Sequence, residues 1–156
     1  MNVSRNFILA GAVYLVIGIS FGIHMGATGD HTMAPLHAQI NLLGFTLMAV
    51  FGVLYRVFPE TGFSSLARAH FWLHLGGTII LLVMLYLMFS GQIAEESMFP
   101  IAPMAEIAIF VGILLYAYNV LKNLKYFKSQ ALDRSAPLLP NGGSGRHRGV
   151  CRQTSV

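Results

Sequence analysis

The stretch that decides the fold is PLHAQINLLGFTLMAVFGVLYRVFP, residues 35–59. After His37 it runs for about twenty residues without charge until Arg56, which is the length that a helix needs to cross the ~30 Å hydrocarbon core of a bilayer. Helical periodicity brings its small and polar residues to one face. These residues are His37, Asn41, Gly44, Met48, Gly52 and Tyr55. The stretch predicts a membrane helix that packs this face against protein and carries a candidate ligand near one end.

The rest of the chain has the same character. Of its 156 residues 55% are apolar and only 10% are charged, which is too apolar for a soluble domain of this size. The apolar residues form four blocks, each long enough to span a bilayer with some tilt. The blocks are residues 7–25, 37–57, 71–89 and 101–121. With short connections between them, the sequence predicts an all-α integral membrane protein with an antiparallel bundle of four transmembrane helices.

The division of the chain follows from the same composition. We expect residues 1–128 to form the four-helix transmembrane domain. The first block is expected to be retained, because its apolar part is long and lacks a clear small-residue cleavage site. Residues 129–156 are mostly polar and rich in Gly, Pro, Ser and Arg, which predicts a disordered cytoplasmic tail.

The basic residues orient the protein. All ten Lys and Arg residues flank the blocks on one side, and the loops at residues 26–36 and 90–100 contain none. This positive-inside pattern predicts that both termini are cytoplasmic and that the protein is a multi-pass protein of a bacterial inner (plasma) membrane. Topology and lipid headgroups account for the net charge of +4, so no nucleic-acid partner is expected.

Candidate ligands gather between the first two blocks. Within fourteen residues the chain carries His24, Met25, Asp30, His31, Met33 and His37. Imidazole and thioether groups suit copper or heme iron, whereas a single carboxylate is too few for calcium. The alternative is that the loop residues simply lie at the membrane interface. For His37 a functional role is favoured, because a histidine on a membrane helix is costly unless it is paired or functional.

A second histidine pair opens the third block. His70 and His74 are four residues apart and share one helical face, so they could bind a metal. Alternatively, His70 lies at the cytoplasmic interface beside Trp72 and His74 serves packing or hydrogen bonding. Since the second block starts outside and the third inside, we expect His37 and His74 to lie near opposite faces, about 20 Å apart. The partner of His37 would then be His24 or the His37 of a second copy.

Two further features concern helix packing and the outer end. The spacing of Gly18, Gly22 and Gly26 predicts the close approach of another helix. Glu106 lies about a turn and a half from the outer end of the fourth block, where a carboxylate is expected to face the bundle interior. There it would hold the second nitrogen of a histidine or relay a proton. A snorkelling glutamate without a role is the alternative.

Two runs carry a resemblance to a known family. HAQINLLGFTLMAVFGVLYRVFP (37–59) resembles the second transmembrane helix of subunit I in the heme-copper oxidase superfamily, and RAHFWLHLGG (68–77) is similar to a helix start in that subunit. The chain also resembles short four-span proteins described as cytochrome-c-oxidase-subunit-I-like. The resemblance implies that His37 is an axial heme ligand near the outer face. A complete subunit I has many more spans and metal-binding histidines, so this chain alone is not expected to be an enzyme.

Three functional hypotheses follow. In the first, His37 and either His24 or a symmetry mate bind b-type heme near the outer face for electron transfer or gas sensing, and Gly44 and the glycines of the first block leave room for the macrocycle. In the second, His24, His31, His37 and the nearby methionines bind copper from outside. In the third, the chain is a cofactor-free accessory or assembly subunit of a respiratory complex. Besides lipid, a second copy or a larger respiratory complex is the expected partner.

Overall fold

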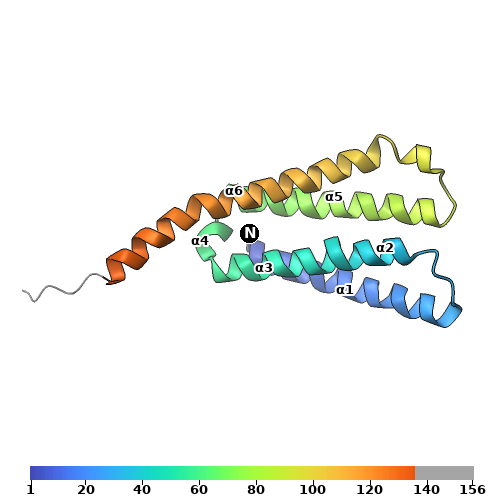
Figure 1. Cartoon of the computed structure of the whole chain (residues 1–156), viewed down its shortest axis with the longest axis horizontal. Coiled ribbons are helices and arrows are strands. Elements are labelled where there is room, and N and C mark those ends of the chain that lie inside the picture. The colour runs from blue at the N-terminus through green and yellow to red at the C-terminus, as the bar shows by residue number, and fades with distance from the viewer. Residues whose placement is uncertain (136–156) are drawn as a thin grey trace, which may run out of the picture.

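A computed structural model describes the backbone of residues 1–135 and the side chains of residues 1–123. All regular elements within residues 1–135 are helices (Figure 1). In chain order they are α1 (Val3–Thr28), α2 (Ala34–Gln39), the π-helix η1 (Ile40–Thr46), α3 (Leu47–Val57), α4 (Pro59–Gly62), α5 (Ser65–Phe89), the 3₁₀-helix η2 (Glu95–Met98) and α6 (Ile101–Ser135).

Four stretches of this described region are long and apolar enough to cross a membrane. They are Val3–Thr28, Ala34–Val57, Ser65–Phe89 and Ile101–Asn123. Each contains one of the four apolar blocks that the sequence predicts. The prediction of an all-α, multi-pass membrane protein is therefore confirmed at the level of fold class.

The predicted start of the tail is wrong. The helix α6 continues to Ser135, so residues 129–135 are helical where the sequence analysis predicts disorder. The segment SQALDRS contains neither Gly nor Pro, and the first helix-breaking residue after it is Pro137. Nothing local therefore ends the helix at residue 129. The rest of the predicted tail, residues 136–156, lies outside the described residues.

Polar side chains define where the first and third spans begin. The side chain of Asn2 accepts a hydrogen bond from the amide of Arg5 at 3.1 Å, and the hydroxyl of Ser64 accepts one from the amide of Ala67 at 3.0 Å. Both are N-caps, which satisfy amides that have no partner inside the helix. At the other end of α1, Gly29 adopts a φ of 69° and its N–H donates to the Met25 carbonyl. This left-handed C-cap favours glycine.

The second span is one helical path with a change of register in the middle. Between α2 and α3, η1 widens to π-type bonding, in which the amide of Leu47 donates to the carbonyl of Leu42, five residues earlier. The predicted packing face is largely confirmed, since Gly44, Met48 and Tyr55 are buried. His37, at the start of that face, is only half-buried. Short π-helical segments often occur at functional sites.

The spans pack as two pairs (Figure 1). In the first pair, α1 packs along α2, η1 and α3, and the predicted close approach at Gly18 and Gly22 is confirmed, because these glycines face Asn41 and His37. A Cβ on Gly26 would meet nothing within 4 Å, so the prediction does not extend to it. In the second pair, α5 packs along α6.

The two pairs are joined at one end of the molecule, where α4 lies beside the N-terminus (Figure 1). We call this the α4 end, and we call the opposite end, with the connections at residues 29–33 and 90–100, the loop end. At the α4 end the side-chain amide of Asn119 in α6 donates to the Thr61 carbonyl at 2.8 Å. The aromatic rings of Phe7 and Phe71, from α1 and α5, meet there at 4.9 Å in an edge-on contact. Side chains from both pairs thus close this end.

Candidate functional site

The residues between the first two spans form a local turn. His24 and His31 are exposed, and the Nδ1 of His31 donates to the Gly29 carbonyl at 2.9 Å. The carboxylate of Asp30 accepts hydrogen bonds from the hydroxyl and the amide of Thr32 at 2.6 and 2.9 Å, and these bonds lower the pKa of Asp30. The side chains of Asp30 and His31 are thus held by neighbours in sequence. No group of three or more His, Cys, Asp or Glu side chains that could hold a metal forms within the described part of the chain.

His37 packs against α1. Its Nδ1 lies 2.9 Å from the carbonyl of Gly18, and its Nε2 lies 3.3 Å from the side-chain amide nitrogen of Asn41. Because a carbonyl only accepts, Nδ1 carries the proton, and Nε2 is left to accept from Asn41. A Cβ on Gly22 would lie 3.2 Å from the His37 ring. Both ring nitrogens of His37 therefore have partners within the protein.

The glycines that were expected to leave room for a heme are covered by side chains instead. A Cβ on Gly18 would lie 2.6 Å from the side-chain oxygen of Asn41, and a Cβ on Gly44 would lie 2.5 Å from the ring of Tyr14. These faces are thus filled by the packing of the first two spans. The residues around His37 do not fit a macrocycle in this arrangement, and heme binding at His37 stays a prediction from the sequence.

The prediction that Glu106 faces the interior is wrong. The buried positions at the start of α6 are Ala102, Ala105 and Ile109, which pack against α5, whereas Glu106 is exposed. Successive helical residues point about 100° apart, so the position after Ala105 lies off the packed stripe. The carboxylate makes no hydrogen bond with a histidine within residues 1–123.

The buried histidines are His70 and His74. Both side chains are 0% exposed, so both histidines lie inside the bundle, and the placement of His70 at the level of the cytoplasmic interface stays a prediction. The helix α5 starts at Ser65, well before the apolar block, which puts His70 five residues and His74 nine residues inside it. At 1.5 Å per residue His74 lies about 13 Å along the helix from its start at Ser65.

Each histidine of the pair has one ring nitrogen held and one free. The Nδ1 of His70 lies 2.9 Å from the hydroxyl of Tyr55, and the Nε2 of His74 donates to the carbonyl of Leu43 at 3.1 Å. The Nε2 of His70, the Nδ1 of His74 and the hydroxyl of Thr78 are buried without a hydrogen-bond partner among the described residues. The three side chains follow one another at intervals of four on one face of α5. Buried polar atoms without partners are rare in native proteins.

The contact with Leu43 also corrects the predicted distance between His37 and His74. Leu43, which contacts His74, lies in η1 only six residues after His37. Six residues correspond to about 9 Å along a helix, which is less than half of the ~20 Å predicted between His37 and His74. The prediction assumed that each histidine marks the start of its span. His74 instead lies deep in α5, at the level of the π-helical segment.

Aromatic rings enclose the pair. The ring of His70 lies 5.0 Å from Phe7, 4.5 Å from Phe51 and 5.4 Å from Tyr116, measured between centroids. Every Asp and Glu within residues 1–123 is exposed, so no carboxylate shares this interior. The site is therefore lined by aromatic rings and contains no carboxylate from residues 1–123.

The spacing of His70 and His74 was visible in the sequence, and the metal hypothesis for the two histidines rests on it, whereas Thr78 was not singled out. Their partners were missed. Tyr55 was assigned to the packing face and to anchoring at the membrane interface, and the carbonyl of Leu43 has no sequence signal at all, since it is a backbone group.

Comparison with protein-family models, with curated proteins and with solved structures found no match to this chain. The fold and the sequence thus define a class, a multi-pass α-helical membrane protein with a buried histidine pair. The resemblance to heme-copper oxidase subunit I remains a hypothesis from two short runs of sequence.

Proposed function

We propose that this chain is a membrane-embedded copper-binding protein, in which His70 and His74 hold a single copper(I) ion between the two helix pairs. The observation that carries the proposal is the pair of buried imidazoles, each with one nitrogen held and the other without a partner. This differs from the copper site predicted at His24, His31 and His37, which lie toward the loop end.

The hydrogen bonds of the pair suit metal ligands. Metal-binding histidines almost always engage their second ring nitrogen with a carbonyl, a carboxylate or water, which fixes the ring and its tautomer. The carbonyl of Leu43 holds His74 in this way, and the Tyr55 hydroxyl holds His70. Metal–nitrogen bonds of about 2 Å place two ligating nitrogens at most ~4 Å apart. The ring centroids of His70 and His74 lie 5.8 Å apart, which allows such a bridge.

The surroundings favour a monovalent ion. Moving an ion into an apolar interior carries a large desolvation cost, and this cost rises steeply with charge. The imidazoles are neutral ligands, and no carboxylate among residues 1–123 is buried to balance a second positive charge. Among the metals that imidazole suits, copper is the one with a monovalent state, and its soft character tolerates few ligands.

The proposal includes the topology expected from the sequence. Arg5, Arg56 and Arg68 lie at or next to the connections of the α4 end, whereas the loop-end connections carry no Lys or Arg. The positive-inside pattern then makes the α4 end cytoplasmic in an antiparallel bundle within a bacterial inner membrane. Cysteine labelling tests this topology. Single cysteines are placed at positions 31 and 63 in a Cys151→Ser background, and their accessibility to an impermeant reagent is measured. Labelling of position 63 from outside would contradict it.

Metal analysis of the detergent-purified chain tests the copper site. After loading with copper(I) and removal of excess, the wild type should retain about one copper per chain. His74→Gln should lose most of it, and the matched variant His24→Gln, in which an exposed imidazole is replaced, should retain it. Retention by His74→Gln and loss by His24→Gln would contradict the proposal and favour the outer site.

A reduced-minus-oxidised visible spectrum of the same preparations separates copper from heme. The proposal predicts no b-type alpha band when the protein is produced with ample heme. A stoichiometric band that disappears in His37→Ala would overturn it in favour of the heme hypothesis.

A further inference from the structure

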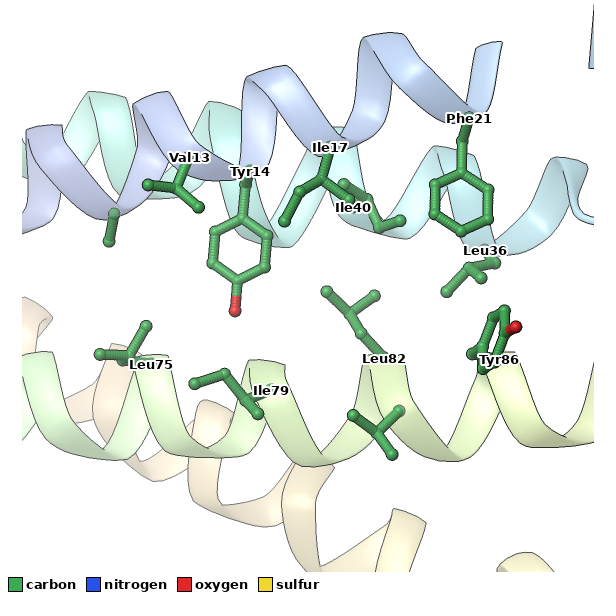
Figure 2. A pocket seen from close by; sticks show the side chains of 12 residues that line it. Val13, Tyr14, Ile17, Phe21, Leu36, Ile40, Leu75, Ile79, Leu82 and Tyr86 are labelled. Atoms are coloured by element: carbon green, nitrogen blue, oxygen red, sulfur yellow. The ribbon is translucent and has the colours of Figure 1, made fainter. Parts of the chain in front are cut away.

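A second candidate ligand-binding site is an apolar groove between α1 and α5, on the loop-end side of the histidine pair (Figure 2). It has a volume of about 500 Å³ and opens along one side of the molecule. Side chains from α1, from the α2–η1 junction and from α5 line it, among them Ile17, Leu36, Ile79 and Leu82. Sites for small molecules are typically apolar hollows of this size with few polar groups.

One polar group points into the groove. The ring of Tyr14 packs on Gly44, and its hydroxyl extends from α1 toward Leu75 and Ile79 of α5 (Figure 2). The Tyr14 side chain is only 9% exposed, and its hydroxyl makes no hydrogen bond with any residue that the structure describes. The hydroxyl itself is accessible from the groove, and a hydroxyl that faces an apolar space without a hydrogen-bond partner is costly. A ligand with a hydrogen-bond acceptor would satisfy it.

The depth of Tyr14 narrows the class of ligand. It lies eleven residues after the start of α1 at Val3, which is about 17 Å along the helix and close to the middle of a core ~30 Å thick. The ester carbonyls of phospholipids lie at the polar boundary of the bilayer, so they do not reach this level. The acceptor must belong to a molecule that dissolves in the hydrocarbon core and still carries a carbonyl group.

We propose that the groove binds a lipid-soluble quinone, with one ring carbonyl accepting a hydrogen bond from the Tyr14 hydroxyl. The apolar walls from α1 and α5 enclose the ring, and its isoprenoid tail leaves through the open side, where Val13 and Val83 are exposed to lipid. This site goes beyond the copper proposal and does not depend on it, since neither His70 nor His74 lines the groove.

Binding of a short-chain quinone to the full-length protein tests the inference. The protein is reconstituted into nanodiscs of quinone-free phosphatidylcholine, and a benzoquinone with a decyl side chain is titrated in equilibrium dialysis against empty nanodiscs. The wild type should bind about one quinone per chain above the partition background. Tyr14→Phe should raise the Kd about five- to tenfold, which corresponds to one lost hydrogen bond. Tyr118→Phe removes an exposed hydroxyl on α6 and should leave the Kd unchanged.

A second variant tests the groove without touching the hydroxyl. Ile79→Trp places a bulky ring in the space and should abolish saturable binding, while circular dichroism and gel filtration check that the variant folds. Equal binding in the wild type and Tyr14→Phe would overturn the inference. So would full binding in Ile79→Trp, uptake no greater than in empty nanodiscs, or equal displacement by a decyl hydrocarbon without a carbonyl, which would indicate a groove for acyl chains.

Discussion

The two ends of the bundle use their polar residues in opposite ways. Toward the α4 end the helix pairs are closed around His70 and His74, both fully buried. Toward the loop end the pairs are separated by an apolar groove, and His24 and His31, at the end of α1 and in the loop that follows, are exposed. The loop end is richer in candidate ligands by sequence, yet the α4 half contains the imidazole nitrogens without partners.

This difference shows that the number of ligand-type residues in a short run is a poor guide to a site. In the first loop, His31 is held by a close neighbour, the Gly29 carbonyl, and both ring nitrogens of His37 have partners in α1 and on its own helix. The histidines of α5 are held by other spans, through Tyr55 and Leu43, which leaves a defined nitrogen on each ring. A site needs ligands whose orientation is fixed by a second layer of contacts.

The largest effect should come from removing one of these second-layer contacts. Tyr55→Phe deletes the hydroxyl that holds the Nδ1 of His70. Loss of such a partner typically weakens metal affinity 10- to 100-fold, and we expect a change of that size in the copper(I) affinity, measured by competition with a chromogenic chelator. Tyr86→Phe, which changes a tyrosine of the loop-end half, is the matched control and should leave the affinity unchanged. Equal changes of the copper(I) affinity in the two variants would contradict a copper site in the α4 half of the bundle.

The next effect concerns packing within the first helix pair. A Cβ on Gly44 would lie 2.5 Å from the Tyr14 ring, so Gly44→Ala should lower the free energy of unfolding by about 1–3 kcal/mol through overpacking. The Cβ of Gly76→Ala would meet nothing within 4 Å, and this helical glycine should accept alanine without loss. Unfolding in mixed micelles with increasing dodecyl sulfate measures both. A Gly44→Ala variant as stable as the wild type would show that the first helix pair can accommodate a methyl group at this position, contrary to the structure.

A smaller effect compares single hydrogen bonds at the two ends. Asn119→Ala removes the buried bond to the Thr61 carbonyl, which links α6 to α4, and should cost about 1 kcal/mol of unfolding free energy. Gln92→Ala removes an exposed bond to the Ser90 hydroxyl and should cost less than about 0.5 kcal/mol. The same micelle titration checks both values. If Gln92→Ala were the more destabilising variant, the closed α4 end would not be the stable end.

The smallest effect is electrostatic and lies in the first loop. Thr32→Val removes the hydroxyl that donates to Asp30, so the lowered pKa of this carboxyl should move up toward its ordinary value. A group with a depressed pKa in the folded state stabilises the loop above its unfolded pKa, and this contribution is lost as the pH falls through the folded pKa. Carbon NMR of the Asp30 carboxyl against pH measures the shift. No upward shift would contradict the proposed hydrogen bonding.

Much of the architecture was predictable from the sequence because spans are long apolar runs. The four blocks, the buried Gly44 and Tyr55, and the close approach at Gly18 follow from length and helical periodicity. The orientation of single residues was harder, as Glu106 illustrates. Whether a helical position faces the interior depends on which neighbour covers it, and the partner of α6 turned out to be α5.

The site itself depended on information that one sequence does not contain. His70 was expected at the interface beside Trp72, and nothing in the sequence shows that the rings of α1, α3 and α6 bury it completely. The position of His74 along the bundle follows from its contact with a backbone carbonyl in a π-helical segment, and no side-chain pattern predicts such a segment.

The most direct test of the central claim is the copper-edge X-ray absorption spectrum of the copper(I)-loaded protein. A copper ion held by His70 and His74 predicts scattering from two imidazole nitrogens at about 2 Å, without sulfur, and loss of this signal in His74→Gln. Sulfur scattering from a methionine, or an imidazole signal that survives in His74→Gln and disappears when His24, His31 and His37 are replaced together, would contradict it and place the metal at the loop end.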